Sequence, residues 1–358
     1  MDYNSYRRKS NAVRIGKIKI GADSPIAIQS MTNTDTNDKE ATLAQVERLC
    51  EAGCEIVRLT APTVESCRTF EYLKNRGIEI PLVADIHFDY KIAIAAAEMG
   101  ADKIRINPGN IGDSQRVAAV VDACKRHRVP IRIGVNSGSL EAHILKKYQG
   151  VCAEALVESA MYHADMLKEL DFEDIVLSVK ASDVNMMIKA NRILSERTSY
   201  PIHLGVTEAG FGNAGLIKSS VGIGTLLSLG IGDTVRVSLT DKPEEEIAAA
   251  KSILNALDLL PDGGMNIVSC PTCGRTKIDL IPLVREFERR AKAEGLFSKK
   301  LKVALMGCAV NGPGEAREAD IGIAGGDGEG LIFKHGKTVR KVKEEHLIDA
   351  LIEEIKML

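Results

Sequence analysis

Tryptophan is absent from this sequence of 358 residues, and aromatic residues make up only 4% of it. Apolar runs approaching the ~20 residues that cross a bilayer as a helix are also absent, so we expect no membrane association. The formal net charge of −2 lacks the basic excess of a general nucleic-acid surface, so we expect no nucleic-acid partner. The basic residues near the start precede no apolar segment, and we expect no secretory signal. The composition is otherwise that of an ordinary globular protein.

Eight cysteines without a secretory signal indicate a reducing cytoplasm, where thiols bind metals or lie buried more often than they form disulfides. Three of them, Cys270, Cys273 and Cys308, lie in the last part of the chain. The other five fall in or beside helical patterns and are interpreted as small buried apolar residues: Cys50, Cys54, Cys67, Cys124 and Cys152.

A repeated alternation of strand-like and helix-like segments fills the first part of the sequence. Alternating strands and helices predict parallel strands, and eight units over about 240 residues favour a (β/α)8 TIM barrel over an open doubly wound sheet. The eight short β-branched runs, each followed by an amphipathic segment, are residues 27–32, 56–60, 82–87, 103–109, 131–136, 174–180, 202–207 and 234–239.

The alternation stops near residue 258, which predicts three parts. Residues 1–258 are expected to form a substrate-binding barrel domain, residues 259–266, with Pro and Gly, a linker, and residues 267–358 a small α+β domain. The Gly-rich run "GGDGEG" lacks the Lys-Ser/Thr ending of a phosphate loop and is interpreted as a hairpin turn. The remaining expected elements of the last part are a helix over 278–295, strands over 301–307 and 320–325, and a final helix over 343–357.

Polar side chains gather where the predicted barrel strands end, and in such barrels this end carries the chemistry. Residues two or four apart in a strand share a face. Three pairs follow this spacing: Arg105 with Asn107, Arg236 with Ser238, and Arg132 with Asn136. Further polar residues at or just past strand ends are Arg58, Asp85, His87, Lys180, His203 and Glu208.

Four arginines and one lysine at the ends of five strands predict an anionic ligand. A single such arginine is equally well explained as a solvated loop charge, but burying five cations at one mouth is costly unless an anion neutralises them. Bidentate arginine geometry suits phosphate oxygens, which predicts a substrate with more than one phosphate group. Asp85 and Glu208 lie among these cations and are candidates for binding a hydroxyl or transferring a proton.

The three late cysteines admit several interpretations. They are too few for a four-cysteine zinc ribbon, and no histidine follows at zinc-finger spacing. A thioredoxin-type motif needs no third cysteine. A cubane iron–sulfur cluster fits three thiolates and one other ligand, for which Glu315, seven residues after Cys308, is the nearest carboxylate. A phosphate-binding barrel transferase with a structural cysteine domain, and a zinc-stabilised binding module, remain alternatives.

Four motifs together resemble one family: "SCPTCGRTK" (269–277), "GCAVNGPGEA" (307–316), "MTNTDT" (31–36) and "RINPGNIG" (105–112). The chain is similar over essentially its whole length to the two-domain bacterial 4-hydroxy-3-methylbut-2-enyl diphosphate synthases of the methylerythritol phosphate route to isoprenoids. The resemblance implies a [4Fe–4S] cluster on Cys270, Cys273, Cys308 and Glu315. It also implies the reductive ring opening of 2-C-methyl-D-erythritol 2,4-cyclodiphosphate by two single electrons from reduced flavodoxin or ferredoxin.

The resemblance further implies roles for individual residues. Glu208 would donate a proton, and Glu315, an exchangeable oxygen ligand, would take part in catalysis. The diphosphate would be held by Arg58, Arg105, Arg132, Lys180 and Arg236 and oriented by Asp85, Asn107, Asn136 and Ser238.

A head-to-tail homodimer is expected as well. The last barrel helix descends ~24 Å from the mouth, and the linker reaches at most ~28 Å. Each cysteine domain would therefore cap the barrel of the other subunit more easily than its own.

Overall fold

The structure is a computed structural model that describes residues 3–111, 113–261, 263–308 and 318–358. It divides into two compact units, residues 1–257 and residues 258–358.

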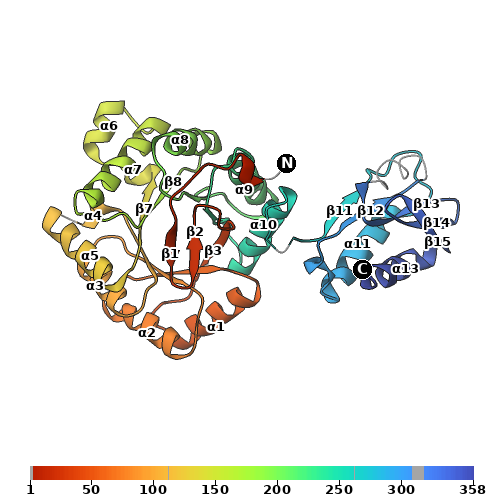
Figure 1. Ribbon diagram of the computed structural model, residues 1–358, viewed down its shortest axis with the longest axis horizontal. Helices are drawn as coiled ribbons and strands as arrows, with labels where there is room; N and C mark the ends of the chain where they lie inside the picture. Colours follow the sequence, from red (N-terminus) through yellow and green to blue (C-terminus); the bar gives the residue numbers. More distant parts are fainter. Residues whose placement is uncertain (1–2, 112, 262, 309–317) are drawn as a thin grey trace. The chain divides into compact units, whose positions relative to one another are not determined.

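The first unit is a closed barrel of parallel strands surrounded by helices (Figure 1). Its sheet, in the described part of the chain, has eight strands in the order β8-β7-β6-β5-β4-β3-β10-β9. A parallel bridge between Leu177 and Ile202 joins β8 to the segment entering β9 and closes the ring. The predicted TIM barrel is thereby confirmed. The strands are β3 (Ala27–Met31), β4 (Ile56–Thr60), β5 (Leu82–Asp85), β6 (Lys103–Ile106), β7 (Ile131–Asn136), β8 (Ile175–Lys180), β9 (His203–Leu204) and β10 (Thr234–Val235).

A helix follows each strand and packs outside the barrel (Figure 1). Aspartates cap several of these helices: Asp38, Asp89, Asp113 and Asp183 each accept a hydrogen bond from a backbone N–H of the first turn. Such caps are worth about 1 kcal/mol each. The helices are α1 (Lys39–Glu51), α2 (Arg68–Asn75), α3 (Tyr90–Glu98), α4 (Pro108–Ile111), α5 (Ser114–His127), α6 (Ala142–Tyr148), α7 (Ala153–Lys168), α8 (Val184–Arg197), α9 (Gly212–Ser228) and α10 (Pro243–Ala256).

A short hairpin that the sequence did not predict covers the amino-terminal end of the barrel. It consists of β1 (Val13–Ile15) and β2 (Ile18–Ile20). Three of its side chains are buried against the first residues of the barrel strands, in one cluster of Val13, Ile15, Ile20, Ala27, Ile56, Val83 and Val176. Burial of each such side chain contributes about 1.5–3 kcal/mol. This apolar packing closes the amino-terminal end of the barrel, and a polar site is expected at the carboxyl end.

The second unit is an α+β domain, as predicted. Its described sheet has the order β11-β12-β13-β14-β15; the first three strands are parallel and the last two antiparallel. The helices α11 (Leu280–Ala293) and α13 (Leu347–Lys356) share a buried core with β12, β13 and β14, which includes Phe287, Leu305, Ile323 and Leu351. The strands are β11 (Asn266–Ser269), β12 (Lys302–Met306), β13 (Ile321–Gly325), β14 (Glu329–Lys334) and β15 (Lys337–Lys343).

The start of the final helix differs from the prediction. It begins at Leu347, not at residue 343, because residues 337–343 pair with β14 as an edge strand. A short 3-10 turn, Glu344–His346, separates the strand from the helix. No helix in the described part of the chain is both long and apolar enough to span a membrane.

Candidate active site

A cavity of about 160 Å³ opens at the carboxyl ends of the barrel strands. Eight of the nine predicted substrate-binding residues line it, together with residues that the sequence did not single out. The lining residues, hereafter the cation pocket, are Arg58, Asp85, His87, Arg105, Arg132, Gly134, Asn136, Ser178, Lys180, Val206, Thr207, Arg236 and Ser238.

The five cations of the pocket start from different heights on their strands. Arg132 is the second residue of β7, whereas Lys180 is the last residue of β8 and Arg236 follows β10. Their long side chains nevertheless reach one cavity, because neighbouring barrel strands are staggered and all of these residues face inward. The prediction that these residues lie together at one mouth is therefore met, although "strand end" describes only some of them.

Two glycines make room for the cations. A Cβ atom on Gly134 of β7 would lie 2.5 Å from Nε of Arg105. A Cβ atom on Gly205, just after β9, would lie 2.8 Å from Nζ of Lys180. Contacts that short do not occur between real side chains, so a side chain at either position would displace a cation from the pocket. In the sequence, only the position of these two glycines between inward-facing polar residues could have indicated this role.

Asp85 is the carboxylate at the centre of the pocket. Its Oδ1 accepts a hydrogen bond of 3.1 Å from Nη1 of Arg105, and its Oδ2 lies 3.9 Å from Nε of Arg58 and 3.6 Å from Nε2 of His87. Burial by itself would raise the pKa of Asp85, but Arg58, His87 and Arg105 outweigh it and hold the pKa well below its usual range. Asp85 is therefore ionised and can only accept hydrogen bonds.

Glu246 of α10 holds Arg236 in place, a partner that the sequence did not reveal. Its carboxylate lies 3.2 Å from Nη2 of Arg236 and accepts hydrogen bonds from the Ser30 hydroxyl at 3.0 Å and the Leu239 N–H at 3.1 Å. Helix α10 starts with three consecutive glutamates, and Glu246 is the buried one, whereas Glu244 pairs with Arg48 on the outside.

The positive charge of the pocket is not fully compensated. Arg132 is 1% exposed, and its Nε and Nη1 atoms have no hydrogen-bond partner within the described structure. Burial, together with neighbouring Arg58 and Arg105, lowers its pKa well below the usual value. Burial and Arg132 do the same to the pKa of Lys180. Unpaired donors in a buried, cationic cavity favour a ligand with several negative charges.

Three predicted residues lie apart from the cavity lining. Asn107 is buried directly after β6. Glu208 is exposed one residue after the lining residue Thr207, and its backbone is left-handed with φ of +53°. That conformation is uncommon for a residue other than glycine and occurs often at functional sites. His203 is buried at the start of β9, not at the mouth, and its Nδ1 lies 2.7 Å from the Thr234 hydroxyl.

The second candidate site lies at the ends of β11 and β12. Cys270 follows β11 and Cys308 follows β12 after Gly307; since these strands pair in parallel, their ends are adjacent. The Cys270 sulfur accepts a hydrogen bond of 3.2 Å from the Gly307 N–H. Cys273 lies on an exposed loop, residues 271–277, hereafter the cysteine loop. Hydrogen bonds from the backbone and side chain of Arg275 lower the pKa of Cys273 and favour its thiolate.

These thiols fit an iron–sulfur cluster by donor chemistry. Three sulfur ligands with an N–H group directed at one sulfur are the ligand set and outer shell that such clusters use. Glu315, the predicted fourth ligand, lies outside the described residues. Within the described residues, no group of three or more His, Cys, Asp or Glu side chains is gathered as around a metal ion.

The barrel cysteines are mostly the buried residues that the sequence predicted. Cys54, Cys67 and Cys124 are buried, and burial raises the pKa of each to about 12. Cys152 is half-buried, and its sulfur accepts a hydrogen bond from the first turn of α7. The prediction is wrong for Cys50, which is exposed on α1 because it falls outside the buried face of that helix.

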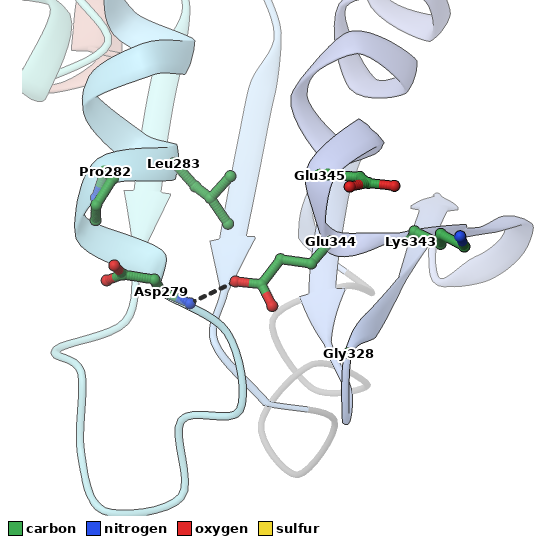
Figure 2. A pocket seen from close by; sticks show the side chains of 7 residues that line it. All are labelled: Asp279, Pro282, Leu283, Gly328, Lys343, Glu344 and Glu345. Atoms are coloured by element: carbon green, nitrogen blue, oxygen red, sulfur yellow. Dashed lines mark hydrogen bonds between the residues drawn. The ribbon is translucent and has the colours of Figure 1, made fainter.

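Another cavity, of about 540 Å³, lies on the second unit beside the start of α11 (Figure 2). Glu344 accepts a hydrogen bond of 2.7 Å from the backbone N–H of Asp279 across it. Three carboxylates and one amine line this cavity, so it does not suit an anion. The lining residues are Asp279, Pro282, Leu283, Gly328, Lys343, Glu344 and Glu345.

Comparison with known families decides between the interpretations of the sequence. The model of the GcpE TIM-barrel domain matches residues 10–251, and that of the GcpE protein C-terminal domain matches residues 266–357. The chain belongs to the GcpE family. The two matched regions fall inside the two compact units of the structure.

A curated GcpE relative from Clostridium tetani is 57% identical to this chain over 350 residues, which cover 98% of this chain and 99% of the relative. It is named 4-hydroxy-3-methylbut-2-en-1-yl diphosphate synthase (flavodoxin). The family resemblance inferred from the motifs is thus confirmed.

Solved structures outside the GcpE family share the barrel. Type I 3-dehydroquinate dehydratase from Clostridium difficile superposes with a TM-score of 0.53 at 13% identity, covering 70% of this chain and 98% of that one. Dihydropteroate synthase from Stenotrophomonas maltophilia gives 0.50 at 16% identity, covering 70% and 100%. At such identities the likeness shows the fold alone, and it does not support a transferase activity.

Proposed function

We propose that this chain converts 2-C-methyl-D-erythritol 2,4-cyclodiphosphate to 4-hydroxy-3-methylbut-2-enyl diphosphate and water, as an iron–sulfur oxidoreductase of isoprenoid precursor synthesis. The observation that carries the proposal is the cation pocket, in which five cations face two nearby carboxylates, Asp85 and Glu246. A diphosphate supplies the missing negative charge. The family to which the chain belongs supplies the reaction.

The pocket residues would bind the diphosphate before any chemistry occurs. Arg58, Arg105, Arg132, Lys180 and Arg236 would donate to its oxygens, and the unpaired Nε and Nη1 atoms of Arg132 are ready donors. Because these groups are already in place and largely buried, each charge-assisted hydrogen bond is stronger than it would be in water. Binding would also relieve the repulsion among the cations themselves.

Asp85, Asn107, Asn136 and Ser238 would orient the carbon end of the substrate. The ionised Asp85 accepts hydrogen bonds, which suits a substrate hydroxyl. Glu208, beside Thr207 at the rim, would donate the proton that the departing oxygen needs to leave as water. This role follows from the family resemblance and from the strained, exposed backbone at this residue.

Cys270, Cys273, Cys308 and Glu315 would hold a [4Fe–4S] cluster. When bound, the cluster would supply electrons one at a time and a Lewis-acidic iron. A one-electron donor is then required twice per turnover. Reduced flavodoxin would serve, as the name of the relative states for that protein, and ferredoxin is the alternative donor.

The chain would work in the cytoplasm as a head-to-tail homodimer, with each cysteine domain serving the barrel of the other subunit. Mixing a Cys273→Ser chain with an Arg132→Met chain should then restore activity, since one of the two shared sites would be intact. No recovery after demonstrated subunit exchange would contradict shared sites.

The experiment that tests the proposal is metal analysis followed by turnover. Protein purified without oxygen should contain about four iron and four sulfide per chain. It should then convert the cyclodiphosphate when reduced flavodoxin is supplied. Stoichiometric zinc without sulfide, in cells with adequate iron and cluster assembly, would instead make the cysteine domain structural and defeat the proposal.

Glu315 can be tested separately from the cysteines. Glu315→Gln should weaken cluster retention or turnover, because an amide is a poorer iron ligand than a carboxylate. A variant with its full iron content and full turnover would show that Glu315 is neither ligand nor catalyst.

A further inference from the structure

The interior of the barrel directly below the cation pocket is polar. In most barrels of this kind branched apolar side chains fill this layer. Here Lys103 at the start of β6, Gln29 of β3 and His203 of β9 are all buried, with Lys103 and His203 0% exposed. None of the three belongs to the lining of the pocket or to the binding roles described above.

Lys103 reaches across the barrel. Its Nζ lies 3.5 Å from Oε1 of Gln29, and two strands, β5 and β4, separate β6 from β3 in the sheet. The amide of Gln29 points its Nε2 into the interior without a hydrogen-bond partner among the described residues. Lys103 forms no ion pair with a carboxylate in the part of the chain that the structure describes.

The charged neighbours of Lys103 are mostly cations. Arg132 and Arg58 act on it most strongly, and burial, followed by these two arginines, lowers its pKa well below the usual value. His203 adds no charge, because burial, Lys180 and Arg132 lower its pKa as well. The titratable or charged groups of the surrounding strands are Arg58 (β4), Asp85 (β5), Arg105 (β6), Arg132 (β7), Lys180 (β8), His203 (β9) and Arg236 (after β10), with Glu246 behind Arg236.

Lys103 is 0% exposed, whereas Lys180 is 8% exposed and borders the cavity. An amine as deeply buried as Lys103 sheds its proton, because an ammonium with neither solvent nor a carboxylate beside it is far costlier than a neutral amine. A polyanion entering the pocket reverses this balance. Several negative charges would then lie just above Lys103, compensate Arg132 and Arg58, and favour the ammonium. Lys103 would therefore become charged only when an anionic ligand binds in the pocket.

We propose that Lys103 is a positioning residue that is neutral beneath the empty cation pocket and takes up a proton when the diphosphate of the substrate binds. The ammonium so formed attracts the diphosphate from below and strengthens its binding. The inference rests on the proposed function, since it requires that the pocket binds a polyanion. By linkage, the affinity for the polyanion falls as the pH rises, and Lys103 contributes part of that slope.

Proton uptake can be measured directly with inorganic pyrophosphate as the probe. The full-length holoenzyme, purified without oxygen, is titrated calorimetrically near pH 8 in two buffers with different ionisation enthalpies. The difference between the two apparent enthalpies gives the number of protons taken up. Wild type, Lys103→Met, Gln29→Glu and the surface control Lys189→Met are compared; Lys189 is exposed on α8, where it pairs with Glu154.

Wild type and Lys189→Met should take up the same number of protons, and Lys103→Met fewer by up to about one. Lys103→Met should also bind pyrophosphate more weakly, on the order of 10-fold. Gln29→Glu should keep the amine but lower the uptake, because a carboxylate within reach of Nζ holds Lys103 protonated before the ligand arrives.

Equal uptake by wild type and folded Lys103→Met would overturn the inference and leave the pocket itself intact. Should Lys103→Met not fold, unchanged uptake in Gln29→Glu would overturn it in the same way. Failure of wild type to bind pyrophosphate at all would overturn the polyanion pocket, and the role of Lys103 with it. If Lys103 were only structural, Lys103→Met would change the stability of the protein without changing the number of protons taken up on binding.

Discussion

The two units build their candidate sites in opposite ways. The barrel holds its site residues on strands whose register and closure leave little freedom, and its cations stand close together before any ligand arrives. The second unit places Cys270 and Cys308 at two adjacent strand ends but carries Cys273 on the exposed cysteine loop. The barrel therefore fixes its cations in place, whereas the thiols of the second unit stand on two strand ends and an exposed loop.

The two units also differ in the energetic cost of holding their functional groups in the folded state. In the barrel the cost is electrostatic: like charges are held together without full compensation, and Asp85 and Glu246 keep them in place. In the second unit the exposed cysteine loop carries a single thiol, Cys273, whose thiolate is open to solvent and has no comparable burial cost. Variants of the two units should therefore fail in different ways.

The largest expected effect comes from the cysteine loop. Cys273→Ser should remove a cluster ligand and lower turnover by on the order of 1,000-fold, equivalent to about 4 kcal/mol. Iron content and the visible absorbance of the cluster should fall with it. Cys50→Ser, which changes an exposed cysteine of the barrel unit, is the matched control and should retain both. A Cys273→Ser protein with its full iron content would show that the loop does not bind the cluster.

Asp85→Asn should cause the next largest effect, on stability. It leaves Arg58 and Arg105 without their carboxylate, and removing one partner of a buried ion pair costs about 3–5 kcal/mol. The pKa of Asp85 is lower in the folded than in the unfolded protein, so its stabilisation is complete above the unfolded value of about 4 and is lost as the pH falls below it.

Denaturant unfolding of wild type and Asp85→Asn between neutral and acidic pH measures this effect. The gap between the two should be full at pH 7 and shrink below about pH 4. A gap that stays constant into acid would mean that the ionised carboxylate is not what stabilises the pocket.

Arg132→Met should separate binding from stability. Loss of a buried guanidinium should weaken pyrophosphate binding about 100-fold, since charge-assisted hydrogen bonds contribute about 1.5–3 kcal/mol each. The melting temperature should stay level or rise, because a buried cation among cations is replaced by an apolar side chain. Arg126→Met, on the exposed face of α5, should change neither. A large loss of stability in Arg132→Met would contradict the interpretation that repulsion among the pocket cations destabilises the folded protein.

The smallest expected effect concerns the second unit alone. Glu344→Ala removes the acceptor of the Asp279 N–H at the start of α11 (Figure 2) and should cost about 0.5–1 kcal/mol in the unfolding of this unit. Pyrophosphate binding to the barrel should not change. Glu345→Ala is the control, because Glu345 of the same cavity makes an exposed pair with His346 and does not accept from Asp279. Equal destabilisation by the two variants would show that the hydrogen bond contributes nothing.

Much of the fold and part of the site could be predicted because they depend on local periodicity. Eight β-branched runs, each followed by an amphipathic segment, indicated the eight units. The two-residue period of a strand placed Arg105 on one face with Asn107, and Arg236 on one face with Ser238. The spacing of Cys270 and Cys273 likewise stands in the sequence, whatever the fold around it.

The hairpin β1–β2, Glu246 and Lys103 could not be predicted in the same way. Three consecutive glutamates open α10, and only the rotational phase of the helix against the barrel selects Glu246 as the partner of Arg236. Lys103 is the first residue of a predicted strand, and nothing in the sequence indicated its burial. It is buried because the apolar cluster around the hairpin β1–β2 closes the barrel on one side of it and the cation pocket lies on the other.

By itself, the sequence determined the number of strand–helix units, the polar residues on the inward faces and the three thiols of the second unit. Tertiary structure alone decided which of these polar groups meet, and with what charge. Asp85 stays ionised between Arg58 and Arg105. Lys103 lies below them and, within the described residues, forms no ion pair with a carboxylate. The physical reason is that ionisation depends on burial and on neighbours brought together from distant strands, and both are set only when the barrel closes.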